Sequence, residues 1–135
     1  RDMLETSKND MPRTVYNRCS FIIEENRRVH DTVEAFKRND LKTVGSLLYE
    51  AHYGISELYE VSCPESDFLV DFAKTNPRVL GARQTGGGFG GCILNIVHED
   101  AIKEFNAEVT QAYFEKFNIR LEAFEVQPSG GTSIQ

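Results

Sequence analysis

The sequence predicts an α+β domain in which an antiparallel sheet packs against helices on one face. Four stretches carry apolar residues at helical spacing, two short runs are typical of strands, and a glycine-rich segment joins these two runs. The chain has 135 residues, which fits one domain because domains cluster at about 100–150 residues.

The first half of the chain is predicted to be helical. Residues 1–17 lack a clean period and carry no prediction. Residues 18–38 have the pattern of a long amphipathic helix, a kind that normally turns its apolar stripe to the core. Asp40 is a good N-cap for a second, antiparallel helix over residues 41–58, although Gly45 and Gly54 weaken that pattern. The stripe of the first helix consists of Ile22, Val29, Val33 and Phe36.

A capping box formed by Ser62 and Glu65, with Pro64 in the first turn, predicts the start of a third helix. Its buried face includes Phe68, Leu69 and Phe72, and Asn76-Pro77 ends it.

The second half mixes strands with one more helix. Residues 78–83 and 92–97 are predicted strands joined by the glycine-rich loop. Glu99-Asp100 opens a fourth helix that runs to Phe117. Residues 120–126 have the composition of a further strand, and the tail after it is expected either to fray or to add a short edge.

Charge and hydropathy exclude two classes of partner. The chain has 21 acidic and 15 basic residues, a formal charge of −6, and no concentration of Lys or Arg. We therefore expect no binding to nucleic acid or to an anionic membrane surface, since both depend on a basic footprint. No apolar run approaches the ~20 residues that span a bilayer.

Cysteine and histidine usage favours a cytoplasmic protein without a metal site. The chain has three cysteines, an odd number, and they lie far apart in the sequence. This cysteine usage is typical of a protein in a reducing compartment. The three residues are Cys19, Cys63 and Cys92. The three histidines form no ligand spacing, so we interpret them as structural or solvated. The chain begins Arg1-Asp2-Met3, and we expect it to be a piece of a longer protein.

The glycine loop, defined here as residues 85–91, is the strongest functional signal. Five of the ten glycines fall within six positions, at Gly86, Gly87, Gly88, Gly90 and Gly91. Such density costs backbone entropy, and consecutive unshielded N–H groups can form a nest for phosphate oxygens. The alternative is a flexible hairpin connection, which we favour less for so many glycines.

The glycine loop does not match the known nucleotide-binding loops. The G-x-G-x-x-G spacing is present, but a dinucleotide site needs a helix after the loop and a strand-like run follows instead. No Lys-Ser or Lys-Thr closes a Walker loop, and the chain has no His-Arg-Asp or Asp-Phe-Gly of a protein kinase.

Residues 81–92, GARQTGGGFGGC, resemble the third, C-terminal motif of the GHMP small-molecule kinases in its galactokinase form. Residues 59–65, YEVSCPE, are similar to a second galactokinase signature. His52 lies where that family has a Ser-His pair, although Ala51 replaces the serine. Gln84 stands where the family is expected to have methionine or leucine.

The resemblance runs from about Arg18 to the C-terminus and implies a ferredoxin-like GHMP kinase C-terminal domain over residues 18–135. It implies transfer of the γ-phosphoryl group of ATP to the C1 hydroxyl of galactose, with Mg²⁺. The family's galactose motif, ATP loop and catalytic Arg and Asp belong to the N-terminal lobe, which is the expected partner. That lobe is expected to hold most of the ATP and Mg²⁺ contacts, so no catalytic residue or metal ligand is assigned to this chain.

Within the chain, the resemblance assigns the five loop glycines to a motif near the substrate phosphates. Thr85 and Arg83 flank them as the nearest side chains able to contact an anion, and Arg83 could equally be a solvated charge at a strand end. Cys63 and Cys92 are interpreted as packed residues and not as nucleophiles.

Three other functions stay open at the level of sequence. One is a kinase for another sugar, such as N-acetylgalactosamine. Another is a non-catalytic, galactose-dependent transcriptional sensor. The third is an autonomous ferredoxin-like ligand-binding module.

Overall fold

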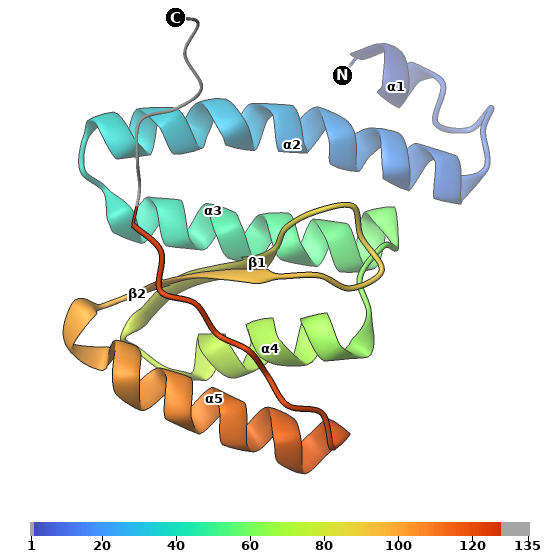
Figure 1. Ribbon diagram of the computed structural model, residues 1–135. Helices are drawn as coiled ribbons and strands as arrows, with labels where there is room; N and C mark the ends of the chain where they lie inside the picture. The colour runs from blue at the N-terminus through green and yellow to red at the C-terminus, as the bar shows by residue number, and fades with distance from the viewer. Residues whose placement is uncertain (1, 128–135) are drawn as a thin grey trace, which may run out of the picture.

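A two-stranded antiparallel hairpin lies between helices in the computed structural model, which describes residues 2–127 (Figure 1). Strand β1 (Val79–Gln84) pairs with β2 (Ile93–Val97), with Gln84 opposite Ile93 and a bulge between Val79 and Gly81. The α+β class and the strand, loop, strand order are confirmed. The predicted tail, residues 128–135, lies outside the described residues.

Helices cover both sides of the hairpin, whereas we expected them on one face. Helix α3 (Leu41–Tyr53) lies between the hairpin and α2 (Arg13–Lys37), and α4 (Pro64–Thr75) and α5 (Ile102–Phe117) lie on the other side (Figure 1). Burial along β1 agrees with this, because the successive residues Gly81 and Ala82 lie toward opposite faces of the strand and both are buried. Shorter elements complete the fold: α1 (Asp2–Thr6), the π-helical η1 (Gly54–Tyr59) and the 3₁₀-helical η2 (Glu99–Ala101).

Backbone contact between α3 and β1 sets the distance between these elements. A Cβ built on Gly45 would lie 1.9 Å from the carbonyl oxygen of Leu80, and one on Gly81 would lie 2.4 Å from the Cα of Gly45. Gly45, which weakened the helix prediction, is therefore required by packing.

The main core lies on the far side of β1 from α3. It joins β1 to α4 and α5 through Val70, Ala73, Val79, Ala82, Phe105 and Val109. The fourth predicted helix is present as α5, and its buried residues are Phe105, Val109 and Tyr113. Phe68, Leu69 and Phe72 of α4 are half-buried.

The predicted face of α2 is wrong. Ile22, Val29, Val33 and Phe36 are 45–56% exposed, and the buried residues are Phe21, Arg28 and Ala35. Tertiary contacts choose this face: Phe21 packs against Tyr59, with 5.2 Å between ring centroids, and fills the space over Gly54.

Two side-chain caps at helix N-termini were predicted, and one is correct. The Asp40 side chain accepts hydrogen bonds from the backbone N–H and the hydroxyl of Thr43, which confirms the cap of α3. The Ser62–Glu65 capping box is wrong, because α4 begins at Pro64 and its N-cap residue is Cys63. A box with Ser62 as N-cap needs a helix that starts one residue earlier.

The predicted strand over residues 120–126 is also wrong. Asn118 has φ +56° and ends α5, and the residues after it, as far as they are described, form neither helix nor strand. A strand needs a hydrogen-bonded partner, and this segment pairs with neither β1 nor β2. Leu121 packs against the core, whereas Phe124 and Val126 are exposed.

Among the described residues, no helix has both the length and the apolar character needed to cross a bilayer.

We predict that Gly45→Ala destabilises the chain by about 3 kcal/mol, because the new methyl group overlaps the backbone of β1 and the two elements must separate. Urea unfolding followed by circular dichroism measures this change. Gly87→Ala is the matched control, since nothing lies within 4 Å of a Cβ at that position. Equal stability of the two variants would contradict the prediction.

Candidate functional site

The glycine loop closes the hairpin with an unusual backbone. The N–H of Thr85 donates to the carbonyl of Cys92 at 2.9 Å, and the Thr85 hydroxyl donates to the same oxygen at 3.2 Å. Positive φ angles occur at Gly86, Gly88, Gly90 and Gly91, with values of +94° to +121°. These positions require glycine because other residues are strained there. The Thr85 hydroxyl, through its hydrogen bond to the Cys92 carbonyl, is engaged in closing the loop.

Val61, in the segment after η1, anchors the loop. Its carbonyl accepts the N–H of Phe89 at 2.6 Å and the side-chain amide of Gln84 at 3.3 Å. A Cβ on Gly88 would lie 2.9 Å from the Cβ of Val61. Gly88 is thus needed for packing within the chain.

Gly86 and Gly87 are different, because nothing lies within 4 Å of a Cβ built at either position. Gly87 also has no left-handed φ, so neither its conformation nor its packing requires glycine. An exposed backbone at these two residues leaves room for a ligand to approach the N–H groups.

A hollow of about 180 Å³ lies beside the loop. Gly86, Gly87, Gly88, Arg83 and Gln84 line one side of it, so the structure brings most of the predicted site residues together. Residues of α2, η1 and the following segment line the other side, namely Phe21, Glu25, Ile55, Tyr59 and Val61.

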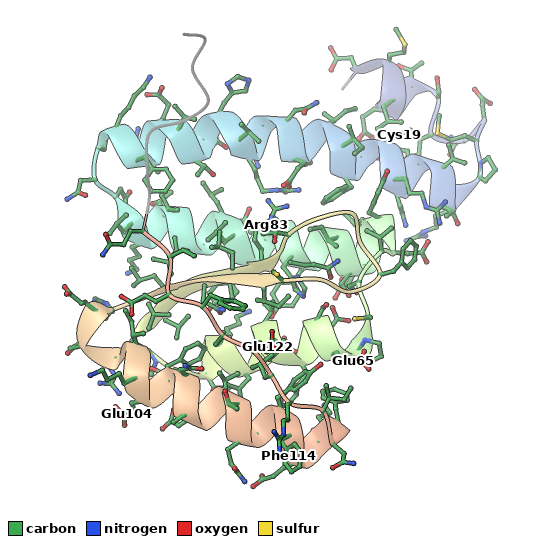
Figure 2. The ribbon with its side chains drawn as sticks, viewed as in Figure 1. Cys19, Glu65, Arg83, Glu104, Phe114 and Glu122 are labelled. Carbon is green, nitrogen blue, oxygen red and sulfur yellow. The ribbon has the colours of Figure 1, made fainter. Side chains whose placement is uncertain are left out.

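Arg83 points from β1 toward α2 and is held there by an ion pair (Figure 2). Its Nη1 donates to Glu25 at 2.7 Å, and its Nε donates to the carbonyl of Gln84. The second Glu25 oxygen accepts from Arg28 at 2.8 Å. Arg83 is therefore neither free nor simply solvated, and these two guanidiniums share one carboxylate, which leaves a positive charge beside the loop.

His52 is buried behind the loop, with only 1% of its surface exposed. Its Nδ1 accepts the backbone N–H of Gln84 at 3.3 Å, and its Nε2 lies 3.2 Å from Asp67 of α4. Burial lowers the pKa of His52, and the Asp67 carboxylate partly opposes this shift. The structural interpretation of this histidine is correct, but its contact with the base of the loop carried no signal in the sequence.

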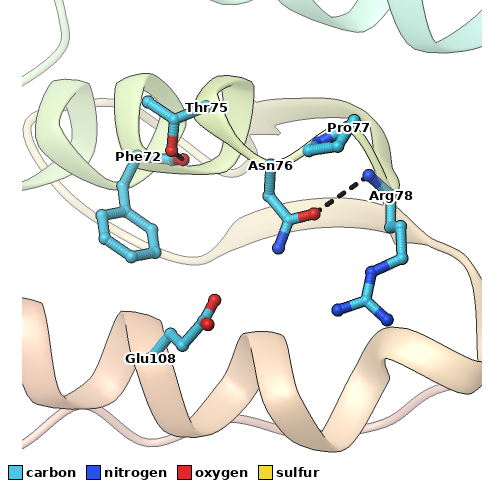
Figure 3. Close-up of a pocket in the computed structure, with 6 residues that line it drawn as sticks. All are labelled: Phe72, Thr75, Asn76, Pro77, Arg78 and Glu108. Atoms are coloured by element: carbon cyan, nitrogen blue, oxygen red, sulfur yellow. Dashed lines mark hydrogen bonds between the residues drawn. The ribbon is translucent and has the colours of Figure 1, made fainter.

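A larger hollow of about 320 Å³ lies where α4 turns into β1 (Figure 3). The Asn76 side chain accepts the N–H of Arg78 there, and the Arg78 guanidinium is paired with Glu104. The Thr75 hydroxyl donates to the carbonyl of Phe72. Three of the polar side chains that line this hollow therefore have partners within the chain, and no residue of the glycine loop lines it.

The residues present fit a phosphate better than a metal ion. The open N–H groups of Gly86 and Gly87 and the positive charge near Arg83 suit an anion. In the part of the chain that the structure describes, no group of three or more His, Cys, Asp or Glu is placed to hold a metal ion.

The family described as GHMP kinases, C terminal, matches residues 32–116. The chain belongs to the GHMP kinases. It is 39% identical over 134 residues to a galactokinase of Thermotoga neapolitana, which covers 97% of this chain and 38% of that protein. It is 46% identical over 96 residues to a galactokinase of Clostridium perfringens, which covers 71% of this chain and 25% of the relative.

A solved structure supports the same family. The galactokinase of Lactococcus lactis, determined in complex with galactose, matches this GHMP kinase chain with a TM-score of 0.83 and 32% identity. The match covers 88% of this chain and 31% of the other. The chain therefore spans less than two-fifths of the length of these relatives.

We predict that Gly88→Ala and Gly87→Ala differ in stability. The first places a methyl group against Val61 at a left-handed φ and is expected to cost about 1–3 kcal/mol. The second is expected to change stability by less than about 0.5 kcal/mol, as do most surface substitutions. Thermal unfolding of both variants tests this, and a destabilised Gly87→Ala would show that the loop is packed where we find it open.

We predict that His52 makes the chain less stable as the pH falls from 7 to 5. Its folded-state pKa is lowered, so below the ordinary value near 6.5 the unfolded chain binds the proton more readily. That contribution to stability is present above this value and declines below it. Urea unfolding across the pH range should show a smaller slope for His52→Asn than for wild type, and equal slopes would contradict the prediction.

Proposed function

We propose that this chain is the C-terminal lobe of a galactokinase, which transfers the γ-phosphoryl group of ATP to the C1 hydroxyl of galactose. The observation that carries the proposal is the glycine loop, which has the galactokinase-type sequence. Packing within the chain does not explain two of its glycines, Gly86 and Gly87, because nothing lies within 4 Å of a Cβ built at either position. The relatives named galactokinase support this reading over the sensor and the N-acetylgalactosamine kinase.

The part that this lobe plays is to present backbone N–H groups and positive charge to a phosphate. Phosphoryl transfer depends on positioning and on compensation of negative charge. The N–H groups of Gly86 and Gly87 and the guanidinium of Arg83 supply both without taking part in bond breaking. Mg²⁺, when bound, neutralises charge on the phosphates, and its ligands belong in this proposal to the rest of the protein, as do most ATP contacts.

The proposed substrates, partner and location follow from the same interpretation. Galactose and ATP are the proposed substrates, the N-terminal lobe of the same polypeptide is the proposed partner, and the cytoplasm is the proposed location. A purified chain should fold and yet lack activity.

The test is a coupled assay of ADP formation with ATP, Mg²⁺ and sugar. We expect turnover with galactose by the full-length protein, much less with N-acetylgalactosamine, and none by residues 1–135 alone. Adding a separately expressed N-terminal lobe to the chain should restore activity. Galactose-dependent turnover by the isolated chain would refute the half-enzyme reading, and a full-length protein that binds galactose without turnover would favour the sensor.

We further predict that Gly87→Val in the full-length protein lowers kcat/KM about tenfold or more, a loss of about 1.4 kcal/mol in transition-state stabilisation. The side chain has space in the fold and would block only what approaches from outside. Melting temperature should stay within about 1 °C of wild type, so a parallel loss of stability and activity would instead indicate a structural glycine.

A further inference from the structure

Gln84 is the residue at which β1 ends and the glycine loop begins, and it is almost fully buried, with 1% exposed. Its backbone N–H donates to a side chain, the Nδ1 of His52. Its side-chain Nε2 donates to the carbonyls of Gly90 and Val61, each at 3.3 Å. Gln84 therefore connects the base of the loop, its far end and its anchor.

His52 reaches Gln84 with one defined tautomer. A ring nitrogen that accepts a hydrogen bond carries no proton, so the proton of the neutral ring is on Nε2. That nitrogen faces Asp67, whose other oxygen accepts the Ser56 hydroxyl at 3.1 Å. The Asp67 carboxylate lies 3.2 Å from Nε2 without the geometry of a hydrogen bond, and a negative charge on that side of the ring favours a proton on Nε2, which leaves Nδ1 free to accept.

The same anchor also fixes the loop from the other side. The Val61 carbonyl that accepts from Gln84 accepts the N–H of Phe89 as well. Movement of Gln84 would therefore displace Phe89 and Gly90. The open glycines, Gly86 and Gly87, lie between Gln84 and these residues in the sequence.

We propose that His52 is a positioning residue for the glycine loop: through the Gln84 N–H it fixes the base of the loop and so the placement of Gly86 and Gly87. Its effect on phosphoryl transfer rests on the function proposed above. Because a misplaced phosphate contact acts on the chemical step, loss of the Nδ1 acceptor should lower kcat about tenfold and leave the KM for galactose unchanged.

Two substitutions in the full-length protein separate the two ring nitrogens. His52→Asn keeps an amide oxygen near the place of Nδ1, and His52→Gln keeps an amide nitrogen near the place of Nε2. We expect His52→Asn to retain kcat within about threefold and His52→Gln to lose about tenfold per folded molecule. The reverse order, or equal losses that follow melting temperature, would overturn the proposal.

A second measurement does not depend on activity. In wild-type full-length protein, ¹⁵N NMR of His52 should show an unprotonated Nδ1 and a protonated Nε2 at pH 7. Amide hydrogen exchange at residues 85–92 should be about tenfold faster in His52→Gln than in wild type and nearly unchanged in His52→Asn.

These readouts distinguish the two proposals. Absence of galactose phosphorylation by the wild type would defeat the proposed function, while tautomer and exchange would still decide the role of His52. If His52→Gln does not fold, the wild-type tautomer and the His52→Asn variant remain decisive. A protonated Nδ1 in the wild type, or loop exchange in His52→Asn as fast as in unfolded chain, would overturn the positioning role.

Discussion

The contact between the backbones of Gly45 and Gly81 is the constraint on which the site depends. It brings α3 against β1 with no side chain between them. His52 lies two turns after Gly45 on the same buried side of α3, and Gln84 lies three residues after Gly81. Close approach at the glycines therefore brings the ring of His52 within reach of the Gln84 N–H. The base of the glycine loop is located by a helix as well as by its own hairpin.

The charge at the site depends on contacts between α2 and β1. Glu25 is shared by Arg28 and Arg83, and Arg28 also lies 5.7 Å from the ring centroid of Phe21. A half-buried carboxylate with two cationic partners is well satisfied, and the surplus charge is positive. In a chain whose formal charge is −6, this local positive charge beside open N–H groups supports the phosphate contact that we propose.

In the proposed enzyme, the site on this chain is one part of the catalytic centre. The relatives are more than twice as long as this chain, and phosphoryl transfer needs a nucleotide cradle, a metal ion and an oriented hydroxyl together. The described residues offer backbone donors and one cationic cluster. In the proposed enzyme this lobe completes a phosphate environment that the other lobe begins.

Local signals in the sequence determined much of the fold. Helical periodicity located α3 and α5, strand composition located β1 and β2, and glycine density located the loop, because each depends on neighbouring residues alone. Tertiary structure decided the rest. Phe21 is buried and Ile22 exposed because of what packs on α2, and residues 120–126 form no strand because no edge pairs with them. Gly45 is required, and His52 meets Gln84, only because α3 lies against β1; contacts between residues 32 positions apart have no local signature.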